Sequence, residues 1–88
     1  MVTWKIVYTR QAIKDSKKIE SANLKPKVVK LLDLLKTNPY TTHPSFEKLL
    51  GDLSGAYSRR INIHHRLVYQ LYDKEKTVKI IRMWTHYE

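Results

Sequence analysis

The 88-residue chain contains no cysteine, only two glycines and only three prolines. The lack of cysteine excludes disulfides, thiolate zinc sites and a cysteine nucleophile. No apolar run approaches the roughly 20 residues that a membrane-spanning helix needs. Residues 1–7 also lack the apolar core and the small-residue cleavage site of a secretory signal. We therefore expect a single cytoplasmic domain that covers residues 1–88.

Acidic side chains are scarce as well. Eight Asp+Glu stand against 17 Lys+Arg, which gives a formal net charge of +9. So large an excess on so short a chain indicates a polyanionic partner: nucleic acid, an anionic membrane or an acidic protein. Residues 57–88 carry seven basic side chains, of which four are arginine. Because the planar guanidinium binds two oxygens at once, arginine in strands favours phosphate or carboxylate binding over simple solvation.

The first half of the chain predicts one strand and two helices. Residues 2–8 are rich in β-branched and aromatic side chains and predict a strand. Thr9 can cap a helix over residues 10–22, whose apolar stripe is thin. Pro26 suits the first turn of a second helix, in which apolar residues at 28, 31, 32 and 35 form one face. Asn38 and Pro39 would end that helix.

The second half predicts strands after a turn-rich connection. Residues 39–55 form that connection, with a short helical turn expected at about 46–50. Strands are predicted over 56–63, 66–72 and 77–85, with a tight turn or bulge at 64–65 and a polar turn at 73–76. The expected fold class is α+β. An N-terminal strand and two antiparallel helices would pack on an antiparallel sheet that a C-terminal three-stranded meander completes.

Three separated side chains could together cleave RNA without a metal. Glu47 lies in the turn-rich connection, where basic surroundings would keep it ionised and able to remove a proton. Arg66 could bind a phosphate, and His86 could donate a proton near neutral pH. The spacing does not show that they meet, and a surface carboxylate and a terminal histidine remain the alternative reading of Glu47 and His86.

No motif for a cofactor or a metal occurs. The chain has no P-loop, dinucleotide fingerprint, His-Glu-x-x-His or Gly-x-Ser-x-Gly sequence. His64 and His65 are adjacent, so in a strand they would point to opposite faces and could not both bind one metal ion. His43 falls in the loop and is expected to be exposed. We expect neither a cofactor nor a metal.

Residues 53–69 read LSGAYSRRINIHHRLVY. This segment resembles the central signature of the YoeB/Txe family of ribosome-dependent mRNA interferase toxins, within the RelE-like superfamily. Phe46-Glu47-Lys48-Leu49 resembles the Pro-Glu-x-Leu of that family, and His86-Tyr87 its closing His-Tyr. The resemblance covers nearly the whole chain.

The resemblance implies a RelE-like fold and a toxin of a type II toxin–antitoxin system. Such a toxin inhibits translation by cutting mRNA in the ribosomal A site, without a metal, and leaves a 2′,3′-cyclic phosphate. It would contact the ribosome through 16S and 23S rRNA, be neutralised by a YefM/Axe-like antitoxin, and bind operator DNA only through that antitoxin. A homodimer is also possible.

The family pattern assigns roles to residues of this chain. Glu47 would be the general base, Arg66 would stabilise the charge on the phosphorane, and His86 would be the general acid. Tyr87 would orient the substrate or the histidine, and Arg60 would contact phosphate, as would Arg59.

Two positions depart from the family pattern. Leu50 stands where relatives can carry a lysine, and Trp84-Thr85 stand where they often carry Arg-Tyr. Lys48 or Arg82 could supply the basic contacts instead. Trp84 could stack on a base, or it could belong to the core or to an antitoxin contact.

Two alternatives to the nuclease remain open. A non-catalytic basic module that holds RNA or the ribosome explains the charge equally well, but it leaves Glu47 in a basic field without a role. A protein-interaction partner such as a DNA-binding repressor subunit is the other. No recognition helix follows the second helix, which speaks against it.

Overall fold

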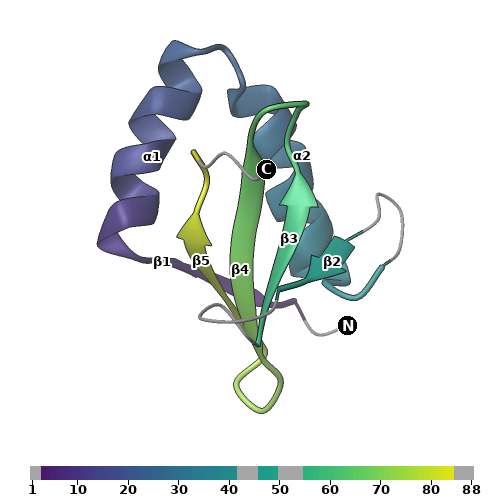
Figure 1. Cartoon of the computed structure of the whole chain (residues 1–88). Coiled ribbons are helices and arrows are strands. Elements are labelled where there is room, and N and C mark those ends of the chain that lie inside the picture. The colour runs from purple at the N-terminus through teal and green to yellow at the C-terminus, as the bar shows by residue number, and fades with distance from the viewer. Residues whose placement is uncertain (1–2, 42–45, 50–54, 85–88) are drawn as a thin grey trace.

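The computed structural model describes residues 3–41, 46–49 and 55–84 (Figure 1). These residues form β1 (Lys5–Tyr8), α1 (Arg10–Ser21), α2 (Lys25–Thr37), β2 (Phe46–Lys48), β3 (Ala56–Arg60), β4 (Arg66–Tyr72) and β5 (Thr77–Arg82). The order of the elements confirms the predicted α+β class. None of the helices in these three segments is both long and apolar enough to cross a membrane.

The strands form one five-stranded sheet in the order β1-β5-β4-β3-β2. β2, β3, β4 and β5 pair antiparallel, whereas β1 runs parallel to β5, with Lys5 opposite Thr77 and Tyr8 opposite Ile80. The sheet is therefore mixed, and the expectation of a wholly antiparallel sheet is wrong. Parallel neighbours need a long crossover connection, and the chain between β1 and β5, with both helices, supplies it.

The expected helical turn at residues 46–50 is also wrong, because Phe46–Lys48 is the edge strand β2. Its three residues pair with Tyr57 to Arg59 of β3. The Phe46 ring meets the Tyr57 ring edge to face, with centroids 5.5 Å apart. Cross-strand aromatic contacts of this kind stabilise a strand pair, and here they outweigh the helix preference of Glu47 and Lys48.

The helix boundaries follow the predicted signals closely. Thr9 caps α1: its Oγ1 accepts a hydrogen bond from the backbone N–H of Ala12 at 3.0 Å. The same hydroxyl donates to the carbonyl of Ile81 at 2.9 Å, which ties the start of α1 to β5. In α2, Pro26 lies in the first turn and Asn38 is the C-cap residue. The predicted apolar face of this helix is confirmed.

Both helices cover the same face of the sheet (Figure 1). The core between them includes Leu35 of α2, Tyr69 of β4 and Ile80 of β5, none of which is exposed. Because side chains alternate along a strand, Ser58, Arg60 and Arg66 point away from this core. The opposite face of β3 and β4 therefore carries polar and cationic side chains.

Candidate active site

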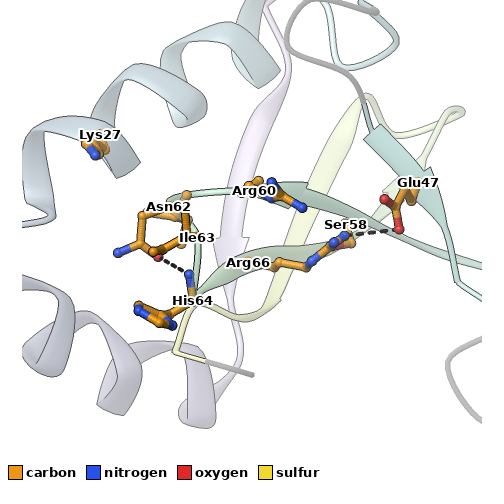
Figure 2. Close-up of a pocket in the computed structure, with 9 residues that line it drawn as sticks. Lys27, Glu47, Ser58, Arg60, Asn62, Ile63, His64 and Arg66 are labelled. Carbon is orange, nitrogen blue, oxygen red and sulfur yellow. Dashed lines mark hydrogen bonds and ion pairs between the residues drawn. The ribbon is translucent and has the colours of Figure 1, made fainter. Parts of the chain in front are cut away.

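A cleft of about 830 Å³ opens where β2, β3, β4 and the β3–β4 loop meet the start of α2 (Figure 2). Its lining residues are Lys27, Glu47, Ser58, Arg60, Ile61, Asn62, Ile63, His64 and Arg66. Among the described residues, its lining therefore carries three cationic side chains and one carboxylate. Such a cleft suits an anionic ligand and places one ionisable oxygen base inside a positive field.

Glu47 and Arg66 meet in this cleft. Glu47 Oε2 lies 3.0 Å from Arg66 Nη1, and Figure 2 shows the two side chains pointing toward each other from β2 and β4. Sheet register explains the meeting, since Glu47 is opposite Ser58 on β3, and Ser58 Oγ accepts a 3.4 Å hydrogen bond from the same Nη1. The fold thus brings these two separated residues together, and the catalytic roles assigned to them remain predictions.

The two partners differ in exposure. The Glu47 side chain is 66% exposed, whereas that of Arg66 is 18% exposed. The ion pair thus joins a carboxylate that solvent reaches freely to a guanidinium held against the sheet. Arg60 is opposite Arg66 in register and is exposed on the same face. A phosphate entering this cleft would meet both guanidinium groups.

The loop between β3 and β4 forms the rim of the cleft. Its turn depends on Asn62, whose Oδ1 accepts hydrogen bonds from the backbone N–H groups of His64 at 2.9 Å and His65 at 2.7 Å. The turn exposes the His64 side chain at the rim and buries that of His65. The tight turn predicted at residues 64–65 is confirmed. The two rings differ in exposure but stay near each other, with centroids 6.3 Å apart in a T-shaped arrangement.

The chain leaving β5 passes beside this rim. The Trp84 ring stacks on the His65 ring, with centroids 3.8 Å apart. Arg82 Nε binds Asp15 Oδ2 at 2.8 Å, and its Nη2 donates to the Trp84 carbonyl at 3.0 Å. Neither Arg82 nor Trp84 lines the cleft, and their predicted RNA contacts remain predictions.

Arg59 corrects the sequence interpretation. Its side chain is 0% exposed and lies on the helix side of β3. Its guanidinium donates to Tyr69 Oη at 2.8 Å and to the carbonyls of Pro39 at 3.0 Å and Thr41 at 2.6 Å, and it lies over the Phe46 ring. The predicted RNA contact of Arg59 is therefore wrong in this fold. Its role is internal: it joins the residues after α2 to the sheet.

Lys48 is exposed on β2 but does not line the cleft, because it follows Glu47 directly and points to the other face. Its RNA contact stays a prediction. His86 and Tyr87 lie outside the described residues, as do His43 and Leu50.

Sequence reasoning missed four residues at or near the site. Lys27 reaches the cleft from α2, and no pattern in the sequence places that helix beside β3. Ser58 lies inside the recognised signature without having been singled out. Asn62 carried a detectable signal, because an Asn side chain often forms a turn by accepting a hydrogen bond from the backbone two residues further on. Asp15 accepts hydrogen bonds from the backbone of the residues that follow β5, but in the sequence it could not be distinguished from an acid on a helix surface.

No group of three or more His, Cys, Asp or Glu side chains in the described segments lies close enough together to hold a metal ion. The described side chains that line the cleft include one carboxylate, one imidazole, one amine and two guanidinium groups. This set supplies proton transfer and anion stabilisation from side chains alone.

Comparison with known proteins gives one protein family. The family described as "YoeB-like toxin of bacterial type II toxin-antitoxin system" matches residues 8–87. A curated relative, "Toxin YoeB" of Mycobacterium bovis, is 38% identical over 52 residues. This match includes 59% of the chain and spans 61% of the length of the relative.

Solved structures match over nearly the full chain. The "YoeB/ParE toxin from Agrobacterium tumefaciens" has a TM-score of 0.84 and 29% identity, covering 94% of this chain and 99% of that one. A chain of the "YoeB-YefM complex from Staphylococcus aureus" has a TM-score of 0.77 and 34% identity, covering 96% and 98%. A chain of the "YoeB dimer from Staphylococcus aureus" has a TM-score of 0.82 and 34% identity, covering 98% and 100%.

Proposed function

Because the chain belongs to the YoeB-like toxins of bacterial type II toxin–antitoxin systems, we propose that it is a ribosome-dependent endoribonuclease that cuts mRNA in the A site. The observation that carries the proposal is the Glu47–Arg66 pair, at 3.0 Å, in a cleft whose described lining also carries the cationic Lys27 and Arg60. A carboxylate beside a guanidinium on an open, positive surface supplies the base and the anion stabiliser that cleavage of RNA needs.

The reaction is an intramolecular transfer. Glu47 takes the proton of the 2′-hydroxyl, and the 2′-oxygen attacks the adjacent phosphorus. The P–O5′ bond breaks as the O2′–P bond forms, which leaves a 2′,3′-cyclic phosphate and a free 5′-hydroxyl. DNA lacks the 2′-hydroxyl and cannot react in this way. A placed general base contributes on the order of 10²- to 10⁴-fold in rate.

Arg66 holds the charge that develops on the phosphate. Its guanidinium is mostly buried and braced by Ser58, so it needs little reorganisation when the substrate arrives. In the free protein it pairs with Glu47, and a substrate phosphate would draw the guanidinium toward itself and leave the carboxylate for the hydroxyl. Arg60, exposed opposite Arg66 in register, would hold a neighbouring phosphate oxygen.

His86 is proposed as the general acid that protonates the leaving 5′-oxygen, and Tyr87 as the residue that orients it. Support comes from Trp84, whose ring stacks on the ring of His65. His65 stands in the sequence between His64 and Arg66, which both line the cleft. Two further residues span at most about 7 Å. The chain beyond Trp84 therefore starts within reach of the rim.

Dependence on the ribosome follows from the openness of the site. With 66% of the Glu47 side chain exposed, the free protein does not surround the reacting atoms. In-line geometry must then be imposed on a flexible RNA from outside, and this geometry can supply a large share of the rate. The ribosome, which already fixes the mRNA in the A site, would provide it.

We also propose that this toxin acts in the cytoplasm and is neutralised by an antitoxin like the YefM of the Staphylococcus aureus complex. A net charge of +9 suits an acidic inhibitor as well as rRNA. A homodimer is a further proposal, since the other Staphylococcus aureus structure is described as a YoeB dimer.

The direct test uses ribosomes programmed with a defined mRNA, with and without EDTA. Cleavage that is insensitive to EDTA and leaves a 2′,3′-cyclic phosphate supports the proposal. Glu47→Gln should lower the rate by at least about 10²-fold. Glu75→Gln, the same change in the exposed β4–β5 turn, should leave the rate unchanged.

Protection of the A-site mRNA without a cut would refute the nuclease and support the non-catalytic RNA- or ribosome-binding module. Operator binding by the chain alone would instead revive the repressor subunit. A rate that falls equally in Glu47→Gln and Glu75→Gln would show that charge, and not proton transfer by Glu47, is what matters.

A further inference from the structure

Asp15 of α1 is a buried acid whose side chain is 0% exposed. Its Oδ1 accepts a hydrogen bond from Gln11 Nε2 at 2.9 Å. Its Oδ2 accepts from Arg82 Nε at 2.8 Å, from the backbone N–H of Met83 at 3.0 Å and from that of Trp84 at 3.2 Å. One carboxylate thus binds three consecutive residues at the end of β5.

These bonds keep the carboxylate charged. Burial by itself raises the pKa of Asp15, but the hydrogen bonds from the Met83 N–H, Gln11, Arg82 and the Trp84 N–H outweigh it and lower the pKa below its ordinary value. A buried ion is tolerated only when it is paired and hydrogen-bonded. The four donors meet that requirement, and they make this a strong internal anchor.

The anchor acts where the sheet stops. β5 ends at Arg82, so the N–H groups of Met83 and Trp84 are bound by Asp15 in place of a neighbouring strand. Trp84 is also held through its carbonyl, which accepts from Arg82 Nη2, and through its ring, which stacks on His65. Three contacts of different chemistry therefore fix the position and direction of residue 84.

We propose that Asp15 is a positioning residue of the active site. Through the backbone of Met83 and Trp84 it fixes the point from which the chain continues toward His86. The inference rests on the proposed function, in which His86 is the general acid. Asp15 itself belongs to α1, is 0% exposed and does not line the cleft.

The proposal matters because proton transfer depends on sub-ångström placement. A displacement of about 1 Å at a reacting group can cost about 10²-fold in rate, even when its cause lies far from the chemistry. Asp15→Asn keeps the size of the side chain but removes its charge. It also turns one of the two accepting oxygens into an NH₂ donor, which opposes the donors already there.

The alternative is that Asp15 only joins α1 to β5 and supports the fold. A cycle of four proteins separates the two roles: the wild type, Asp15→Asn, His86→Gln and the double variant. Single-turnover cleavage in programmed ribosomes gives the maximal rate and the half-saturating toxin concentration. Each protein is measured at a temperature well below its own Tm.

We expect Asp15→Asn to lower the maximal rate about 10²-fold, with little change in the half-saturating concentration. In the His86→Gln background the same substitution should have almost no further effect, because residues that act through one another are not additive. Asp33→Asn, an equal loss of charge at an exposed position of α2, should leave both parameters unchanged.

An equal loss of rate from Asp15→Asn in both backgrounds would overturn the inference and leave Asp15 a structural role. A His86→Gln protein that cleaves at the wild-type rate would instead refute the proposed role of His86, so the two failures are distinguishable. If Asp15→Asn does not fold, Gln11→Leu replaces it in the cycle. That change removes one bond to the carboxylate and should give a smaller loss that also disappears with His86→Gln.

Discussion

Arg59 and Arg60 are neighbours on β3, but one is buried and the other is exposed. The same substitution should therefore affect a different property at each position. Arg59→Met and Arg60→Met remove the same charge and leave an unbranched side chain of similar length. We expect the first to destabilise the fold and the second to weaken RNA binding. The contrast follows from exposure alone, because Arg59 is 0% exposed whereas Arg60 is exposed beside the cleft.

The size of the first effect follows from the hydrogen bonds. Arg59 donates to the hydroxyl of Tyr69 and to the carbonyls of Pro39 and Thr41. Each buried polar group that loses its partner costs about 1–3 kcal/mol, and removing a buried charge returns part of that cost. The expected net loss is about 2–4 kcal/mol. For a domain of this size that corresponds to a fall in Tm of about 10–30 °C.

Urea unfolding followed by tryptophan fluorescence measures the free energy of unfolding of both variants. The free energy of unfolding of Arg60→Met should stay within about 0.5 kcal/mol of the wild-type value, as it does for most exposed substitutions. Its affinity for ribosomes, measured at low salt, should be lower than that of the wild type. The pKa of the Tyr69 phenol gives a second signal. Burial raises this pKa and the charge of Arg59 opposes that rise, so the pKa should be higher in Arg59→Met than in the wild type. Equal destabilisation by the two substitutions, or a loss of ribosome binding confined to Arg59→Met, would refute this reasoning.

Three further predictions concern stability. The unfolded carboxyl of Asp15 titrates near 3.8 and its folded pKa is lower, so its contribution is complete above about pH 4 and is lost as the pH falls through the folded value. Acid unfolding should therefore be less steep in Asp15→Asn than in Asp33→Asn. Thr9→Ala removes a helix cap and should cost about 1–2 kcal/mol in urea unfolding, with Thr9→Ser restoring most of it. Gly55→Ala should cost about 1–2 kcal/mol from backbone strain alone, because φ is +92° and a Cβ would meet nothing within 4 Å; a cost near zero would contradict this.

The features that could be predicted from the sequence are those fixed by local chemistry. The cap at Thr9, the apolar face of α2 and the turn at residues 64–65 each depend on a few neighbouring side chains, and all three are confirmed. Glu47 and Arg66 were grouped by their chemistry and by the family pattern, but their spacing in the sequence did not show that they meet, and sheet register brings them together.

The features that escaped prediction depend on pairing between distant segments. β2 exists because β3 lies beside it, and Glu47 and Lys48 alone favour a helix. The parallel pairing of β1 with β5 cannot be read from either strand. Nothing local separates the buried Arg59 from the exposed Arg60, because two adjacent arginines differ only in which face of the strand they occupy.

The strand order also determines when the molecule can become active during its own synthesis. β5, the last strand that the structure describes, lies inside the sheet between β1 and β4. A nascent chain that stops short of Arg82 lacks part of β5, the strand with which both β1 and β4 pair. The side chain of Arg82, which donates a hydrogen bond to Asp15, is missing as well. Pairings of such long sequence separation form late. The ribosome must therefore have translated residues 77–82 before the product can complete its sheet.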